Sequence, residues 1–117
     1  MARKSISKEF MFLFRGGSDP AELSREEMRQ VMDRWASWMG QLKKRGQLKR
    51  GHPLDDAGKV LTGRKGQEIR PFAETRDSVG GYLLVQARSL SQAAKIAQGC
   101  PIFDRGGSVE VRQIVPM

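Results

Sequence analysis

His52 is the only histidine in this chain of 117 residues and the side chain best suited to acid–base chemistry. An imidazole titrates near neutral pH without perturbation, so His52 could act as a general acid or base. Carboxylates at Asp55, Asp56 or Asp77 could orient it, and Asp77 is the one assigned here to a catalytic pair with His52. The alternative is a histidine in a loop that caps a turn or hydrogen-bonds to the backbone.

Two arginines and a tyrosine are candidates for binding a ligand. Arg15 follows a predicted strand, Arg70 precedes a proline, and Tyr82 begins another predicted strand. A guanidinium at a strand end can hold a carboxylate or phosphate through two parallel hydrogen bonds, which predicts a small anionic ligand. In the alternative, Arg15 pairs with a carboxylate such as Glu74 or Asp77, and Tyr82 packs within the sheet.

The sequence predicts neither a metal nor a cofactor. One histidine and one cysteine cannot supply a four-ligand zinc site, and the adjacent Asp55 and Asp56 are typical of a solvated turn. Cys100 lies between Gly99 and Pro101, a position typical of a small buried residue rather than a nucleophile. No glycine pair is followed by the Lys-Ser/Thr of a phosphate-binding loop, and no GxGxxG motif opens a helix.

The elements that position these residues alternate between strand and helix. Ser24 and Glu27 form a capping box, the following apolar stripe has helical spacing, and Gly46 ends that helix. Ser89 or Ser91 caps a second helix. The predicted strands are Glu9–Phe14, Lys59–Thr62, Tyr82–Ala87 and Ser108–Arg112, with Gly51–Leu54 expected to be a loop. This order predicts one α+β domain over residues 1–117 with the ferredoxin-like β-α-β-β-α-β pattern, in which two helices cover one face of an antiparallel sheet.

Two of the predicted strands are apolar on both sides, which predicts that copies of the chain associate. Phe10–Phe14 and Tyr82–Ala87 carry apolar residues at consecutive positions, so both faces of the sheet need cover. Two helices cover only one face. The simplest cover for the other face is a second copy of the sheet, and we therefore expect a homodimer with its sheets face to face.

The net charge of +8 is concentrated in the first part of the chain. Residues 1–70 hold 16 Lys and Arg against 9 Asp and Glu, whereas residues 71–117 hold 5 against 4. The run Lys43–Arg50 contains five positive charges but no aromatic residue for stacking, so a nucleic-acid partner is not expected, and the run is interpreted as a solvated face. No apolar run reaches the roughly 18 residues that cross a membrane, and the expected location is the cytoplasm.

Several segments resemble the YCII-related family, whose larger branch is called DGPF. They include Leu13–Gly16, Gly51–Leu54, Gly58–Val60, Pro71–Glu74 and Gly106–Arg112. The resemblance implies a dimeric α+β barrel of two ferredoxin-like subunits. The family usually has Thr-Asp-Gly before the Pro-Phe pair, whereas this chain has Glu68-Ile69-Arg70. The role of that family aspartate therefore cannot be transferred.

Three classes of function remain open from the sequence. The first is a small-molecule binding or enzymatic domain, with a pocket between sheet and helices lined by Arg15, His52, Arg70 and Tyr82. The resemblance in fold implies that such an enzyme would be a cofactor-free lyase or isomerase. The resemblance also suggests a non-catalytic regulatory protein linked to transcription, because many DGPF members are associated with sigma factors. The third class is nucleic-acid binding through Lys43–Arg50.

Overall fold

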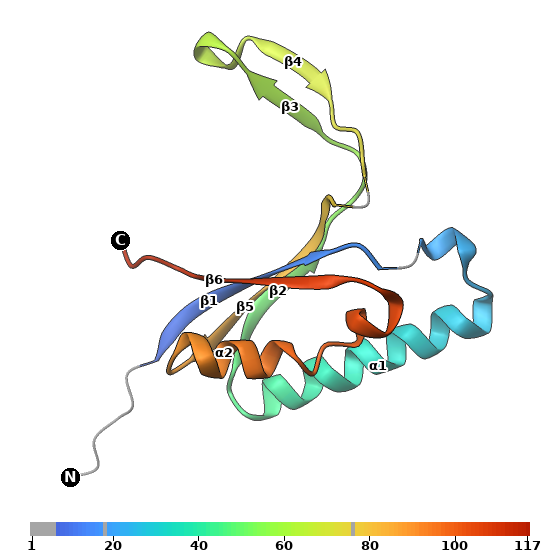
Figure 1. Cartoon of the computed structure of the whole chain (residues 1–117), viewed down its shortest axis with the longest axis vertical. Coiled ribbons are helices and arrows are strands. Elements are labelled where there is room, and N and C mark those ends of the chain that lie inside the picture. The colour runs from blue at the N-terminus through green and yellow to red at the C-terminus, as the bar shows by residue number, and fades with distance from the viewer. Residues whose placement is uncertain (1–6, 18, 76) are drawn as a thin grey trace.

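The computed structural model describes residues 7–17, 19–75 and 77–117. Six strands and two α-helices follow one another along the chain (Figure 1): β1 (Lys8–Arg15), α1 (Arg25–Lys44), β2 (Leu48–Pro53), β3 (Lys59–Thr62), β4 (Glu68–Pro71), β5 (Val79–Ala87), α2 (Leu90–Ala97) and β6 (Ser108–Gln113). Short 3₁₀ turns lie at Pro20–Glu22, Arg64–Gly66 and Pro101–Arg105.

Four of the strands form one antiparallel sheet in the order β2-β5-β1-β6. The core lies on one face of this sheet, where alternate residues of β1 and β5 pack against the helices. The buried residues are Phe10, Phe12, Phe14, Leu83, Val85 and Ala87 from the strands, and Trp38, Leu42, Ala93 and Ala97 from the helices. The predicted α+β, ferredoxin-like fold is therefore confirmed, with both helices on one face.

Both helices begin where the sequence predicts. The Ser24 hydroxyl accepts a hydrogen bond from the Glu27 backbone N–H at 3.0 Å, and the Glu27 carboxylate accepts one from the Ser24 N–H at 2.9 Å. These hydrogen bonds satisfy backbone donors that the first turn leaves free. They also hold the pKa of Glu27 below its usual value. At α2 the cap is Ser89, whose hydroxyl accepts from the Gln92 N–H.

The prediction of a loop at Gly51–Leu54 is wrong for its first three residues. Gly51, His52 and Pro53 belong to β2, an edge strand of the sheet, and pair with Leu83, Tyr82 and Gly81 of β5. Glycine and proline are typical of turns, but here Gly51 and Pro53 are both compatible with the strand. A Cβ at Gly51 would lie 2.4 Å from the Tyr82 carbonyl oxygen, so the close approach of β5 requires glycine, and Pro53 is the last residue of its strand.

The predicted strand Lys59–Thr62 exists, but it is not part of the main sheet. It pairs with β4 in a separate two-stranded hairpin, with Leu61 opposite Ile69 and Val60 opposite Arg70. This hairpin projects away from the sheet (Figure 1). At its base the Phe72 N–H donates to the Gly58 carbonyl oxygen, and the Leu54 N–H donates to that of Gly80.

Candidate functional site

A cavity of about 540 Å³ opens between the middle of α1 and the end of the sheet from which the hairpin projects. Its volume lies within the range of about 300–1,000 Å³ typical of small-molecule sites. The wall on the helix side comes from one stripe of α1, and the wall on the sheet side comes from β1, β2 and β5. The lining residues are Phe14, Gly16, Met32, Trp35, Ala36, Met39, Gly51, His52, Pro53, Gly80, Gly81, Tyr82, Leu83 and Ile102.

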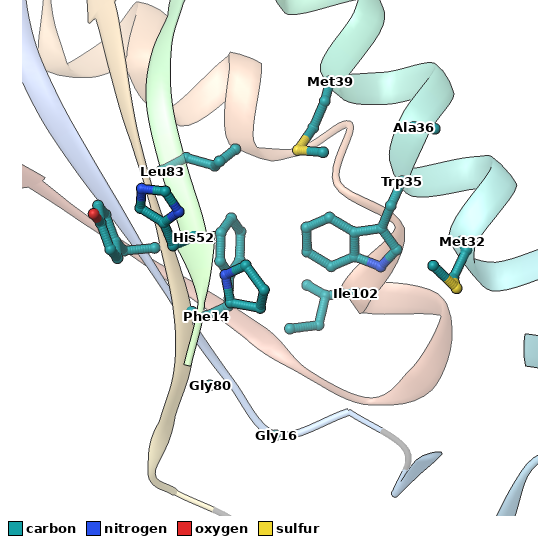
Figure 2. A pocket seen from close by; sticks show the side chains of 14 residues that line it. Phe14, Gly16, Met32, Trp35, Ala36, Met39, His52, Gly80, Leu83 and Ile102 are labelled. Atoms are coloured by element: carbon teal, nitrogen blue, oxygen red, sulfur yellow. The ribbon is translucent and has the colours of Figure 1, made fainter. Parts of the chain in front are cut away.

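Aromatic rings form the inner wall of this cavity. The Phe14 and Trp35 rings meet edge to face with centroids 5.1 Å apart, and Trp35 meets Trp38 in the same way at 5.8 Å. Edge-to-face packing fixes the orientation of each ring. Figure 2 shows the Trp35 indole beside the Phe14 ring, with the Met39 side chain further along α1. The site therefore offers a preformed apolar wall against which a flat ring could stack.

His52 and Tyr82 lie side by side on β2 and β5, with ring centroids 5.8 Å apart. Side chains alternate along a strand, so His52 points to the face opposite that of its neighbours Gly51 and Pro53. Figure 2 shows the His52 imidazole on the far side of β2 from Trp35. The His52 imidazole forms no hydrogen bond or ion pair with any residue that the structure describes. Both rings therefore lie beside the cavity floor rather than within the apolar cavity.

Arg15 is bound within the protein, and the sheet explains its partner. Its Nε and Nη2 donate to Glu110 Oε1 at 3.3 and 3.1 Å, because Arg15 and Glu110 lie on the adjacent strands β1 and β6. Its Nη1 donates to the Asp77 carbonyl oxygen at 2.8 Å. Hydrogen bonds from Arg15, and one from Arg112, hold the pKa of Glu110 below its usual value.

The other predicted site residues lie outside the cavity lining. Arg70 is exposed on β4 of the hairpin, and Asp77 meets Arg15 through its backbone rather than its carboxylate. Asp55 and Asp56 are exposed at the hairpin base, where the Asp55 carboxylate accepts a hydrogen bond from the Ala57 N–H. The structure thus brings together His52 with Tyr82, and Arg15 with the backbone of Asp77. It does not gather all of them in one pocket.

Cys100 is buried, as predicted, with 4 % of its surface exposed. Burial raises the pKa of its thiol to about 12, which suppresses the reactive thiolate at neutral pH. Across residues 7–17, 19–75 and 77–117, no three His, Cys, Asp or Glu side chains gather in an arrangement that could hold a metal ion. In the same part of the chain, no helix is long and apolar enough to cross a membrane.

The sequence did not reveal the residues that form the cavity. Met32, Trp35 and Met39 belong to the apolar stripe that follows Ser24, and helical spacing alone indicates only that this stripe packs against the rest of the protein. The width of the apolar stripe could have distinguished the residues that line the cavity from those that pack on the sheet. Leu42 and Trp38 already fill the contact of α1 with the sheet, so the residues beside them are left partly uncovered, and Met32 has 63 % of its surface exposed.

A sheet of four antiparallel strands, two helices on one face and an apolar cavity between them define a ferredoxin-like domain. The family model of the YCII-related domain matches residues 10–117, and the chain belongs to that family. No curated protein matches the chain. A solved structure with the same fold is 5-chloro-2-hydroxyhydroquinone dehydrochlorinase from Burkholderia phenoliruptrix AC1100 in complex with 2,5-dihydroxybenzoquinone. It is 17% identical, with a TM-score of 0.52, and the match covers 93% of this chain and 95% of that chain.

Proposed function

We propose that this protein binds a small, flat organic molecule, such as a substituted benzene or quinone, in the cavity between α1 and the sheet. The observation that carries the proposal is the preformed aromatic wall of Phe14 and Trp35 in a cavity of about 540 Å³. A single ring fits such a volume, and stacking on an indole favours a planar ligand. The similar fold of a dehydrochlorinase that binds a quinone supports the same class of ligand.

The polar end of the ligand would face the rim of the cavity rather than its wall. His52 and Tyr82 are the two titratable residues along the lining, and the backbone of Gly80 and Gly81 lies beside them. A catalytic role for His52 with Asp77 stays a prediction, and it requires the imidazole to reach the ligand from the opposite face of the sheet. Binding of an anion by Arg15 would likewise require Arg15 to leave Glu110. Arg70, on the hairpin, stays a predicted ligand residue without support from the cavity.

Replacing Ala36 with phenylalanine should weaken ligand binding without unfolding the protein. Ala36 is an exposed residue of α1 whose side chain borders the cavity, so a benzyl group there would occupy the ligand's space. With 2,5-dihydroxybenzoquinone as the probe, we expect saturable quenching of tryptophan fluorescence, because Trp35 is in the wall. The variant should weaken this binding at least about tenfold, a loss of about 1.4 kcal/mol.

Gln30→Phe is the matched control, because Gln30 is exposed on α1 but does not line the cavity. It should bind the probe as the unmodified chain does. If Ala36→Phe leaves the quenching unchanged, the probe binds outside the cavity between α1 and the sheet. If neither this quinone nor an apolar benzene derivative binds at millimolar concentration, the proposed function is wrong.

We further propose that two copies associate through the face of the sheet opposite the helices. Met11, Leu13, Tyr82 and Leu84 lie on that face at paired positions of β1 and β5, and all are only half-buried in a single copy. Charged side chains surround them at the edges, including the Lys49–Glu9 pair at 2.6 Å and the Arg15–Glu110 pair. An apolar centre with a charged rim is typical of a protein–protein interface.

Leu84→Arg should weaken this association, because it places a positive charge at the centre of the apolar patch. We expect the dissociation constant measured by sedimentation velocity to rise at least about tenfold. Leu90→Arg is the control, since Leu90 is an exposed leucine on α2, on the other side of the sheet. Equal effects of the two substitutions would contradict the sheet-face contact.

Nothing in the structure supports the alternatives. The basic run is divided, with Lys43 and Lys44 in the last turn of α1, and Lys49 and Arg50 in β2. Lys49 is paired with Glu9, and the cations that end α1 interact favourably with the carbonyl end of that helix. A cytoplasmic location and a role linked to transcription stay predictions from the sequence.

A further inference from the structure

The β3–β4 hairpin cannot obtain its stability from the rest of its own chain. It projects from the sheet (Figure 1), and its residues contribute nothing to the buried core. Leu61 and Ile69 face each other across the two strands, with 57 % and 59 % of their surfaces exposed. An isolated two-stranded hairpin is only marginally stable in water, so this apolar pair indicates a surface that packs against something else.

The charges of the hairpin are separated along its length. The segment from Lys59 to Pro71 holds four basic residues and one acidic residue, and Arg64 and Lys65 form its tip. The flanking segments, residues 54–58 and 72–78, hold four acidic residues and one basic residue. Arg64 and Lys65 give the tip two positive charges, Lys59 and Arg70 lie at the end of the hairpin next to the base, and the flanking segments have a net charge of −3.

The base of the hairpin carries two adjacent carboxylates, Asp55 and Asp56. Asp55 and Asp56 are exposed, and they take part in no ion pair with a residue that the structure describes. Their adjacent carboxylates interact, and the hydrogen bond and charge of Asp55 raise the pKa of Asp56. A cation supplied from outside would stabilise both ionised carboxylates.

The spacing of these groups is self-complementary under a two-fold rotation. Leu61 is five residues after Asp56 and four before Lys65, and Ile69 is four residues after Lys65 and five before Glu74. The apolar pair thus lies at the centre of the hairpin, between the basic tip and the acidic base. If two hairpins lie antiparallel about a two-fold axis through this centre, each apolar pair meets its copy and each tip meets the other base.

We propose that the β3–β4 hairpin is a self-association arm that packs antiparallel against the same hairpin of a second copy. The Leu61–Ile69 faces form the apolar centre of this contact, and Arg64 and Lys65 of each copy pair with Asp55, Asp56 and Glu74 of the other. This contact rests on the arm alone, and it is separate from the proposed contact between sheet faces. It also does not depend on what the cavity binds.

A charge-swap experiment on the full chain tests this pairing. One variant carries Arg64→Glu and Lys65→Glu, and the other carries Asp55→Lys and Asp56→Lys, both with Leu84→Arg to weaken the sheet-face contact. By sedimentation velocity, each variant alone should self-associate at least about tenfold more weakly than the chain with Leu84→Arg only. An equimolar mixture should recover the association, because both tip–base contacts then join opposite charges.

The control for the apolar centre is Leu61→Ser, which should weaken association without altering charge. A mixture that sediments as the sum of its separate components would overturn the proposal. Unchanged self-association of both variants would also overturn the proposal. If, in addition, the tip variant lost salt-dependent binding to random duplex DNA, the arm would bind nucleic acid instead of a second copy. Circular dichroism confirms that each variant is folded. If Leu84→Arg has no effect while the charge swap behaves as expected, the sheet-face contact fails and the arm contact stands.

Discussion

Replacing Phe12 with alanine is expected to lower the free energy of unfolding by about 3–5 kcal/mol. Phe12 lies in the central strand β1, has no exposed surface, and stacks on Trp38 with centroids 6.5 Å apart. Its truncation leaves a cavity that the neighbouring strands β5 and β6 cannot close, because backbone hydrogen bonds fix their spacing. Since small domains have a total stability of about 5–15 kcal/mol, the change removes a large share of it.

Denaturation in urea, followed by circular dichroism, measures this loss. Phe103→Ala is the matched control, because it deletes the same ring from a site that is already 46 % exposed. Its effect should stay within about 1 kcal/mol, as for most exposed positions. A similar loss of stability in the two variants would show that the core does not depend on the Phe12–Trp38 contact.

The second large effect is expected at Gly51, where alanine should destabilise the protein by about 3 kcal/mol. The added Cβ would lie 2.2 Å from Leu83 Cδ2 and 2.4 Å from the Tyr82 carbonyl oxygen. Leu83 can change rotamer, but the carbonyl belongs to the backbone of β5 and cannot move without disturbing the sheet. The substitution therefore pushes β2 away from β5, and it should also weaken ligand binding, because both strands line the cavity.

Gly40→Ala is expected to raise the free energy of unfolding, whereas Gly51→Ala is expected to lower it. Gly40 lies within α1 with nothing within 4 Å of an added Cβ, so alanine should stabilise the helix by about 0.5–1 kcal/mol. Thermal unfolding of the two variants compares the effects directly. If Gly51→Ala is as harmless as Gly40→Ala, β2 does not pair as closely with β5 as the structure shows.

Local patterns predicted those elements whose formation depends on local chemistry. The capping box at Ser24 and Glu27, the helical spacing behind it and the apolar run of β1 each indicate one structure only. β2 was partly missed because Gly51 and Pro53 favour a turn, and only the close approach of β5 explains them. In the arm, Lys59–Thr62 was predicted as a strand, but β4 was missed because Ile69 is its single residue that favours a strand and none of its residues is buried.

The candidate site was harder to predict than the fold, because it depends on which strands are neighbours. Arg15 was expected either to bind a ligand or to pair with Glu74 or Asp77, but its carboxylate partner is Glu110, since β6 lies beside β1. His52 and Tyr82 were expected to share a site, and they do lie together. Which face of the sheet they occupy depends on the register of β2, which the sequence around Gly51 does not specify.

The main sheet is a single layer, so β2 and β5 present one side to the cavity and the other to the face proposed for association. Gly51 and Pro53 belong to the first side, and His52 between them belongs to the second. A ligand that displaces these strands must therefore alter both surfaces together. By thermodynamic linkage, any factor by which the ligand changes the affinity between copies is the factor by which pairing changes the affinity for the ligand.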